Sequence, residues 1–366
     1  MRVLITATSL RPAYGGPAFS VSRLAAALAT QGLETGLWAA DDSAPGAELP
    51  TATVERLAGP LAEAAASFAP DVIHDNGLWL PHNHRVAALA RQIGVPRIVS
   101  TRGMLEPWAI RHKGLKKQVA WRLYQRRDLE RASALHTTAE TEAANLRAFG
   151  LAAPIVTIPN GVDLADLPDP EPRRDGDART VLFLGRLYPV KGLPMLIEAW
   201  ASVRPSGWRL VIAGPDEAGH RGVLEAATAG AGLGDVVSFP GPVEGGAKAA
   251  LLRRADFLVL PSHSESFGMV VAEALAHGTP VLTTTATPWP SLEAHRCGWR
   301  CAPTPNAIAE ALRIAAACDR ATLRAMGASG RAYVAQTLAW DRVAAEFVAL
   351  YERVVGGASA PREAAA

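Results

Sequence analysis

This sequence has few of the features that mark secreted, membrane-spanning or nucleic-acid-binding proteins. Its 366 residues include only three cysteines, an odd and sparse set that argues against a disulfide framework and for a reducing compartment. The 37 basic and 35 acidic residues give a net charge of +2, so no charge excess points to nucleic acid or to an acidic tail. No run of 18 apolar residues is present, so we expect a cytoplasmic protein without a transmembrane helix.

The composition that remains is that of a large globular protein. Hydrophobic residues make up 49% of the chain and charged residues 20%, and the length favours two domains over one core. The apolar run at residues 2–5 leads directly into a polar glycine loop, so we expect a first strand there and not a signal peptide.

Short apolar segments alternate with helical ones along the chain, which is typical of parallel, doubly wound α/β sheets. Helical periodicity is found over residues 20–31 and 84–93, and over 340–355 near the end. The expected strands are residues 2–5, 71–74, 97–100 and 154–159 in the first half, and 180–184, 209–213, 236–239, 257–260 and 280–283 in the second.

A segment rich in proline and charge, residues 167–178, separates the two halves and predicts a linker. We therefore expect one Rossmann-like domain over residues 1–166 and a second over residues 179–339. Residues 357–366 are expected to form a flexible tail.

The most informative stretch is P-S-H-S-E-S-F-G-M-V-V-A-E-A, residues 261–274. It follows an apolar strand and leads into a helix, whose first N–H groups have no internal partners and can bind an anion. Gly268 lets the backbone approach a phosphate closely. Glu265 precedes the helix and Glu273 lies within it, so the two carboxylates can bind hydroxyls on either side of a diphosphate. A nucleotide sugar has that layout.

Two cations follow the first strand of the second half, in G-R-L-Y-P-V-K-G at residues 185–192. Arg186 and Lys191 lie where open α/β sheets bind ligands, at the carboxyl end of a strand. A guanidinium fork and an ammonium point charge suit a leaving diphosphate. The alternative is a solvated loop with incidental charges.

The Glu-x7-Glu block and the G-R-x-x-x-x-K-G motif resemble those of the retaining glycosyltransferases of family four. The resemblance implies the GT-B fold, with two Rossmann-like domains facing a central cleft and a C-terminal helix, here 340–356, that crosses back to the first domain. It also implies transfer of a hexose from a UDP- or GDP-sugar to a glycan, with retention at the anomeric carbon and without a metal.

The resemblance assigns roles to individual residues. Arg186 and Lys191 offset the charge of the leaving diphosphate, Glu265 orients the sugar hydroxyls and Glu273 binds the ribose. The segment N-G-V-D at 160–163 matches a structural, hinge-side motif of the family. Further donor-binding residues implied in this way are Gly15, Gly16, Gly185, Pro242, Val243, Ser266, Phe267, Gly268, Met269 and Val270.

The first half departs from the family at one position. Many members have a histidine near the transferred sugar where this chain has Arg102. This arginine is expected to bind a donor carboxylate or an acceptor phosphate, with bracing of a loop as the alternative. His74, Asn76 and His136 are further acceptor-side candidates, and His136 equally fits a satisfied core residue.

The motifs H-D-N-G-L-W, T-R-G-M-L-E-P-W-A and T-P-W resemble a bacterial subgroup that assembles exopolysaccharide and lipopolysaccharide, which implies a glycan acceptor linked to a lipid. Residues 111–131 hold eight basic residues against two acids, with aromatic residues interleaved. They predict either a peripheral contact with an anionic membrane, on the inner face of the plasma membrane, or a solvated helix face.

Other functions fit the same fold. A nucleotide-sugar 2-epimerase would use several acids and histidines in its cleft, and a catalytically silent GT-B protein would bind sugar or act as a scaffold. A metal site is not expected, although two groups have suitable side chains: His74, His82 and His84 with Asp75, and His295 with Cys297 and Cys301.

Overall fold

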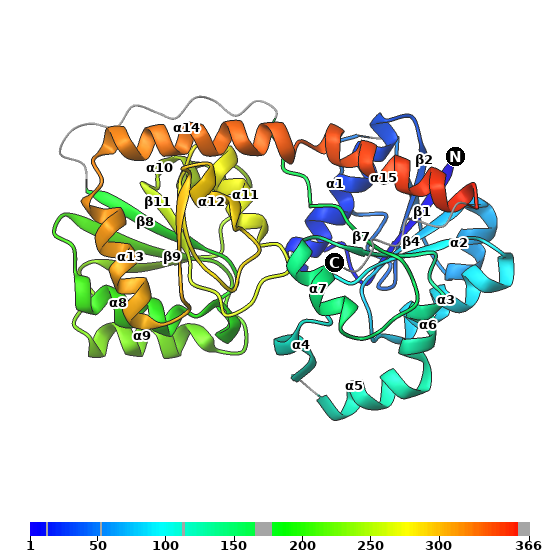
Figure 1. The fold of residues 1–366 in the computed structure, drawn as a ribbon, viewed down its shortest axis with the longest axis horizontal. Coiled ribbons are helices and arrows are strands. Elements are labelled where there is room, and N and C mark those ends of the chain that lie inside the picture. Colours follow the sequence, from blue (N-terminus) through cyan, green and yellow to red (C-terminus); the bar gives the residue numbers. More distant parts are fainter. Residues whose placement is uncertain (12–13, 52, 112–113, 165–177, 358–366) are drawn as a thin grey trace. The chain divides into compact units, whose positions relative to one another are not determined.

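The computed structural model describes residues 1–11, 14–51, 53–111, 114–164 and 178–357, which form two compact α/β units (Figure 1). Unit 1 comprises Met1–Gly161 together with Trp340–Ala366, and unit 2 comprises Val162–Ala339. Residues 167–177 of the expected linker lie outside the described residues, and so do residues 358–366 of the expected tail.

Unit 1 is built on a seven-stranded sheet in the order β3-β2-β1-β4-β5-β6-β7, in which every pairing is parallel. Its strands are β1 (Arg2–Ala7), β2 (Glu34–Ala39), β3 (Glu55–Leu57), β4 (Val72–Asn76), β5 (Arg97–Ser100), β6 (Ala134–Thr137) and β7 (Ile155–Thr157). Its helices are α1 (Gly16–Thr30), α2 (Leu61–Phe68), α3 (Pro81–Ile93), α4 (Pro107–Arg111), α5 (Gly114–Ala120), the π-helix η2 (Trp121–Gln125), α6 (Arg126–Glu130), α7 (Glu140–Arg147) and α15 (Trp340–Val355).

Unit 2 has a six-stranded parallel sheet in the order β10-β9-β8-β11-β12-β13. Its strands are β8 (Arg179–Leu184), β9 (Trp208–Ala213), β10 (Val237–Gly241), β11 (Phe257–Leu260), β12 (Val281–Thr284) and β13 (Gly298–Cys301). Its helices are the 3₁₀-helix η3 (Pro189–Lys191), α8 (Leu193–Val203), α9 (His220–Gly230), α10 (Gly245–Arg254), α11 (Met269–Ala276), α12 (Ser291–Ala294), α13 (Pro305–Ala317) and α14 (Arg320–Thr337).

The central strands are buried because helices cover both faces of a parallel sheet, and their sequences are accordingly apolar throughout. All four residues of β11 are fully buried, for example. The expected α/β class with two parallel, Rossmann-like sheets is therefore confirmed. Nearly every expected strand is present within a residue or two of its predicted ends.

Two of the strands that the sequence pattern did not reveal contain a glycine at a close approach. A Cβ on Gly36 of β2 would lie 2.8 Å from the Phe68 ring, and a Cβ on Gly298 of β13 would lie 2.1 Å from the carbonyl oxygen of Val281. Glycine weakens a strand signal, yet here only glycine leaves room for the neighbouring atoms. The short β3 was also missed, and only the start of β6 was recognised as strand-like.

The C-terminal helix α15 belongs to the core of unit 1. Its side chains Val343, Phe347, Leu350 and Tyr351 are buried and share one hydrophobic cluster with β1 and α1. These residues lie on the face that the helical periodicity predicted. The end of the chain thus completes the unit that its beginning forms. Among the described residues, no helix combines the length and apolarity that crossing a bilayer requires.

The junction before α15 leads to a prediction about stability. A Cβ on Gly161 would lie 2.3 Å from Cδ2 of Trp340, the first residue of α15. We expect Gly161→Ala to lower the free energy of unfolding by about 1–3 kcal/mol, because the indole must move. Urea unfolding measures this. In the matched control Gly46→Ala, the nearest atom is 4.0 Å away and little change is expected. Equal stabilities of the two variants would contradict the packing described.

Candidate functional site

Each sheet has one point at which successive connections leave in opposite directions. In unit 2, β8 has β9 on one side and β11 on the other, and in unit 1, β1 lies between β2 and β4. Loops that follow the carboxyl ends of such neighbouring strands diverge and leave a crevice where ligands bind in open α/β sheets. The motifs predicted from the sequence follow these strands.

In unit 2, the loops after β8 and β11 lie against each other. The backbone N–H of His263 donates to the carbonyl oxygen of Val190 over 2.8 Å. Gly192 has a left-handed φ of 66°, and a Cβ there would lie 2.2 Å from the carbonyl oxygen of Pro261. Glycine is therefore required at position 192, both by the backbone conformation and by the close approach.

This contact brings together two of the three expected catalytic residues. The Nζ of Lys191 lies 2.5 Å from Oε1 of Glu265, and the Ser262 hydroxyl donates to the same oxygen over 2.6 Å. The side chains of Lys191 and Glu265 are 16% and 10% exposed, so they are largely buried but still accessible to a ligand. The pair places a cation and a carboxylate at the point between β8 and β11 where the order of the strands reverses.

The N-terminus of α11 adjoins this pair. Gly268 forms its N-cap with φ 78° and, having no side chain, leaves the first helical N–H groups without a side-chain cap. Glu265, Ser266, Gly268, Met269 and Val270 are all partly exposed. Free N–H groups at a helix N-terminus favour an anion, because the helix dipole adds to their hydrogen bonds.

Two residues that support this loop, from β12 and the segment after it, were not identified from the sequence. The indole Nε1 of Trp289 donates to the carbonyl oxygen of Phe267 over 2.5 Å, and the two rings pack with centroids 5.3 Å apart. Phe267 is consequently buried, and only its backbone borders the site. Thr284 donates to the carbonyl oxygen of Ser262 over 2.6 Å. The motif T-P-W at residues 287–289 was the available signal for Trp289.

Arg186 and Glu273 occupy separate places around the pair. The Arg186 guanidinium is half exposed and bound to Glu217, a contact weak enough to exchange for a ligand. Glu273 pairs with Lys248 of α10 over 2.7 Å, a partner that the sequence did not suggest. The remaining expected donor contacts of unit 2 lie at strand ends: Gly185 bonds to Ala213 after β8, Pro242 is exposed after β10 and Val243 is half-buried beside it.

In unit 1, Arg102 extends into the crevice region between β1 and β4. Its guanidinium donates to Oδ1 of Asn76 over 2.6 and 3.0 Å, to Oδ1 of Asn160 over 2.9 Å and to the Ser20 hydroxyl over 3.4 Å. Burial lowers the pKa of Arg102 to about 10, so it stays protonated at neutral pH. Among the described side chains, no carboxylate lies within ion-pair distance of it.

A small cavity adjoins this guanidinium. Thr8, Tyr14, Pro17, Asn76 and Arg102 contribute to its lining. The N-terminus of α1 begins beside it, with Gly15 at φ 78° as the N-cap and Gly16 as the first helical residue. Asn76 and Arg102 are thus brought next to the glycine loop of the same unit, as acceptor-side residues would need to be, while the contacts of Arg102 also brace the loop.

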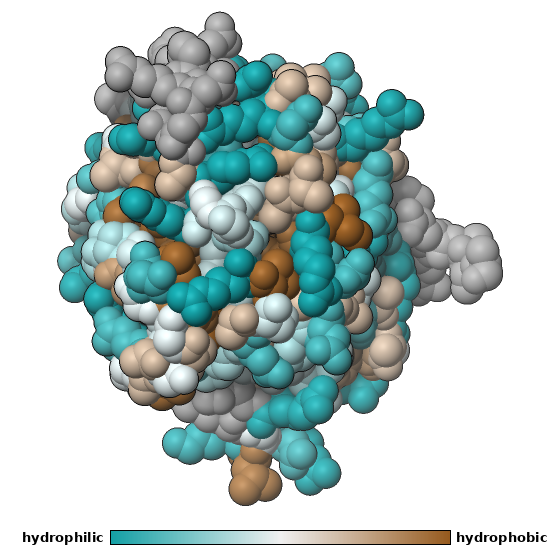
Figure 2. All heavy atoms as spheres, turned by 90° about the vertical axis from the view of Figure 1, so that its left-hand side faces the viewer, coloured by the Kyte–Doolittle hydropathy of each residue, from teal (hydrophilic) through white to brown (hydrophobic). Residues whose placement is uncertain are grey.

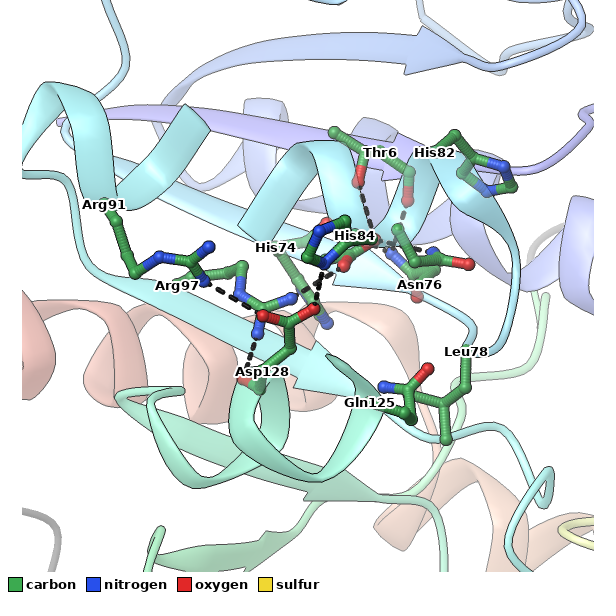
Figure 3. A network of polar contacts seen from close by, with 12 residues as sticks. Thr6, His74, Asn76, Leu78, His82, His84, Arg91, Arg97, Gln125 and Asp128 are labelled. Atoms are coloured by element: carbon green, nitrogen blue, oxygen red, sulfur yellow. Dashed lines mark hydrogen bonds and ion pairs between the residues drawn. The ribbon is translucent and has the colours of Figure 1, made fainter. Parts of the chain in front are cut away.

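An ionic network around the buried Asp128 joins helices α3 and α6 of unit 1. In Figure 3, Arg91 and His84 of α3 converge on Asp128 of α6. His84 Nδ1 lies 2.6 Å and Arg91 Nη1 3.0 Å from its carboxylate oxygens. Arg97 bonds to the carbonyl oxygen of Asp128 and, over 3.0 Å, to the buried Asp75. Within the described parts of the chain, no group of three or more His, Cys, Asp or Glu side chains is arranged to hold a metal ion.

The two halves of the chain match two family models. Residues 15–161 match a glycosyl transferase 4-like domain, and residues 168–332 match the glycosyl transferases of group 1. Both units belong to glycosyltransferase families.

Curated relatives have names consistent with these families. The D-inositol 3-phosphate glycosyltransferase of Actinosynnema mirum is 33% identical over 259 residues, which cover 64% of this chain and 61% of the relative. A glycogen synthase of Mycobacterium tuberculosis is 36% identical over 236 residues, 59% of this chain and 52% of that protein. The matches therefore span about six tenths or less of the relatives' length.

Solved structures match almost the whole chain. Sucrose-phosphate synthase from Thermosynechococcus elongatus has a TM-score of 0.79 at 23% identity and covers 98% of this chain and 100% of its own. Anabaena HepE in complex with UDP and glucose has a TM-score of 0.74 at 21% identity and covers 96% and 99%. At these identities the similarity shows the fold, and the expected GT-B class is confirmed.

Two residues of this glycosyltransferase-family chain that were expected to contact the acceptor, His74 and His136, lie in the interior of unit 1. His136 Nε2 is 2.8 Å from the carbonyl oxygen of Ile158, so that nitrogen carries the hydrogen and Nδ1 accepts from the Ser100 hydroxyl over 2.6 Å. Ser100 then accepts from Nε2 of His74 over 2.6 Å. Nδ1 of His74 accepts from the Tyr351 hydroxyl of α15 over 2.7 Å. Each of the four ring nitrogens therefore has a hydrogen-bond partner when both imidazoles are neutral.

These positions correct the expectation from the sequence. His74 and His136 are fully buried, so direct contact of either imidazole with an acceptor is no longer expected, and the core alternative holds for His136. Burial lowers the pKa of His136 to about 3 and that of His74 well below its usual value. The two histidines link β4 and β6 to the C-terminal helix.

This chain of hydrogen bonds predicts a loss of stability in mild acid. The unfolded imidazoles take up protons near pH 6.5, whereas the folded ones, with lowered pKa values, do not. The free energy of unfolding should therefore fall as the pH drops below about 6.5, by about 1 kcal/mol per histidine between pH 7.5 and 5.5.

Urea unfolding at both pH values measures this loss. In His136→Asn the difference between the two pH values should shrink by about 1 kcal/mol relative to the unmodified chain. In the control His295→Asn the difference should be unchanged, because that ring stacks on Tyr333 without such burial. An unchanged difference in His136→Asn would show that His136 is protonated in the folded state.

Proposed function

We propose that this protein is a retaining glycosyltransferase that transfers a hexose from a UDP- or GDP-sugar to a lipid-linked glycan in the synthesis of cell-surface polysaccharide. The observation that carries the proposal is the ion pair of Lys191 and Glu265 at the reversal of strand order between β8 and β11, beside the uncapped N-terminus of α11. Cation, carboxylate and free N–H groups in one place suit a sugar joined to a diphosphate.

The proposed roles follow from the charges. The diphosphate binds at the N–H groups of α11, where Lys191 and, after leaving Glu217, Arg186 neutralise it. Glu265 exchanges part of its contact with Lys191 for hydroxyls of the sugar. Glu273, held in place by Lys248, binds the ribose. These fixed charges stabilise a leaving group without reorganising during the reaction.

The transfer itself needs no nucleophile from the protein. The bond between the anomeric carbon and the diphosphate oxygen breaks, and its electron pair stays on the diphosphate. The acceptor hydroxyl forms the new bond on the same face and gives its proton to the leaving phosphate oxygen, so the configuration is retained. Catalysis is then positioning plus charge stabilisation, with the cations of the protein serving the diphosphate.

The comparisons support a nucleotide-sugar donor. Relatives are named for transfer to inositol phosphate and for glycogen synthesis, and structural neighbours were solved with UDP, with UDP and glucose, and with UDP-glucose. On the acceptor side, the protonated Arg102 beside Asn76 favours a phosphate-bearing molecule. A lipid-linked glycan fits this chemistry, and the exposed surface of residues 114–127 considered below fits its membrane.

Nucleotide binding tests the donor site directly. Thermal unfolding with UDP, GDP, ADP and dTDP should show stabilisation by one or two of them, about 2.7 kcal/mol at a hundred times the dissociation constant. Lys191→Ala should reduce the shift strongly, because the diphosphate loses its buried counter-charge. The control Arg209→Ala removes an exposed cation outside the site and should leave the shift intact. No shift with any nucleotide would refute the donor site.

Transfer activity separates the enzyme from a silent sugar-binding protein. Glu265→Gln keeps the shape of the side chain but loses the charge that holds Lys191 and the sugar hydroxyls. We expect turnover of the donor to fall by at least about a hundredfold, with a smaller change in nucleotide affinity. Measured donor turnover in the unmodified protein that Glu265→Gln leaves unchanged would exclude the proposed role, and absence of any turnover would favour the silent protein.

A further inference from the structure

Residues 114–130 of unit 1 form a continuous helical segment, α5, η2 and α6, that is anchored along one face. The Trp121 ring packs on Phe149 with centroids 5.2 Å apart. The Tyr124 hydroxyl donates to the carbonyl oxygen of Trp79 over 2.6 Å, and Gln125 accepts from the backbone N–H of Trp79 over 2.8 Å. These side chains recur every three or four residues, as one face of a helix requires.

The opposite face carries exposed apolar side chains. Leu115, Val119 and Leu123 follow each other at intervals of four residues and are 82%, 58% and 71% exposed. Among the other large hydrophobic residues that the structure describes, only Val223 is as exposed as Val119, and Ile314 follows at 51%. The segment with α5 lies at the lower edge of Figure 1, and at the lower edge of Figure 2 a brown hydrophobic group projects beside teal hydrophilic ones.

Cations accompany these apolar residues. Lys116, Arg122, Arg126 and Arg127 are exposed on the same segment. Its two acids offset few of these charges, because Asp128 is buried against Arg91 and His84 and Glu130 is paired with Arg126. Among the described side chains, neither Lys116 nor Arg122 has an ion-pair partner. The exposed face, here called the apolar-basic ridge (Leu115, Lys116, Val119, Arg122 and Leu123), is therefore both apolar and positively charged.

We propose that the apolar-basic ridge docks on an anionic lipid membrane. A bilayer with acidic headgroups meets both properties of the ridge, because the apolar side chains enter the boundary of the acyl chains while the cations reach the phosphates. A second copy of this chain is a poor partner, since its ridge would set like charges against like. Docking holds the protein at the membrane that contains the lipid-linked acceptor, and in this respect it rests on the proposed function. The docking itself does not require sugar transfer.

Vesicle sedimentation of the full chain tests this docking. The protein should bind vesicles of phosphatidylcholine that contain phosphatidylglycerol and should not bind pure phosphatidylcholine, and added salt should weaken the binding. Val119→Asp should reduce the partition coefficient by at least about tenfold, because an apolar side chain no longer enters the membrane. The control Val223→Asp alters a residue of equal exposure on α9 and should leave binding unchanged.

A second pair of variants isolates the charge. Lys116→Glu combined with Arg122→Glu should weaken binding by about 25-fold or more, since each cation near an acidic leaflet contributes a factor of about five. Arg56→Glu combined with Arg209→Glu changes the net charge equally at exposed positions outside the ridge and should have little effect. An equal loss in both double variants would attribute binding to net charge and overturn the ridge.

Other outcomes also decide against the proposal. Equal binding to neutral vesicles, or none to any vesicle, would exclude an anionic membrane as the partner. A dimer in solution that Val119→Asp dissociates, without vesicle binding, would assign the ridge to a second copy of the chain. The thermal shift with nucleotide, measured on the same samples, shows that each variant is folded and keeps a failure of docking separate from a failure of the donor site.

Discussion

The close approach of two loops at the reversal of strand order in unit 2 is the constraint on which the proposed chemistry depends. Because every strand of the sheet is parallel, all carboxyl ends meet at one edge, and the loops after β8 and β11 are neighbours. Gly192 leaves no side chain between its backbone and the Pro261 carbonyl. That contact sets the distance from Lys191 to Glu265, and the contacts of Ser262, Thr284 and Trp289 hold the second loop in register with it.

The two units use polar groups differently. Unit 2 keeps the charges of its candidate site at partly exposed loop ends, where an ion pair can open to admit a ligand. Unit 1 buries them: Asp75 with Arg97, Arg102 with amide oxygens, and two neutral histidines in a chain that ends at Tyr351. Buried polar groups are costly unless they are fully bonded, so their partners determine the positions of several elements at once. One of these elements is α15, the last helix, whose Tyr351 is hydrogen-bonded to His74 in the first sheet.

This difference bears on function. A site that binds a highly charged donor needs cations that are available yet held in place, and a salt-bridged pair at the surface of a rigid sheet meets that need. A surface that binds a membrane needs the opposite, side chains without partners on a firmly anchored element. The segment of residues 114–130 combines the two conditions, because aromatic and polar residues anchor one face and leave the other open.

Much of the fold was predictable from the sequence, and so were the positions of the loops that carry the candidate donor-side residues. Apolar strands, helical periodicity in residues 340–355 and glycine at Gly15 and Gly268 follow from local rules, since burial on both faces, a period of 3.6 residues and positive φ each restrict residue type locally. The spacing of Glu265 and Glu273 across a helix start is local as well. For these reasons the α/β class and the two parallel sheets were predicted correctly, and the roles of the donor-side motifs remain predictions.

Only the tertiary structure decided which side chains meet. Lys191 and Glu265 are 74 residues apart, Lys248 and Glu273 come from successive helices, and Trp289 reaches a loop 22 residues earlier. The burial of His74 and His136 depends on α15, more than 200 residues downstream of both in the chain, and no local pattern could show that. The strands β2 and β13 were missed for a related reason, because their glycines are explained by neighbours in space. Sequence patterns report the conformation of a segment, whereas its contacts depend on where the rest of the chain folds.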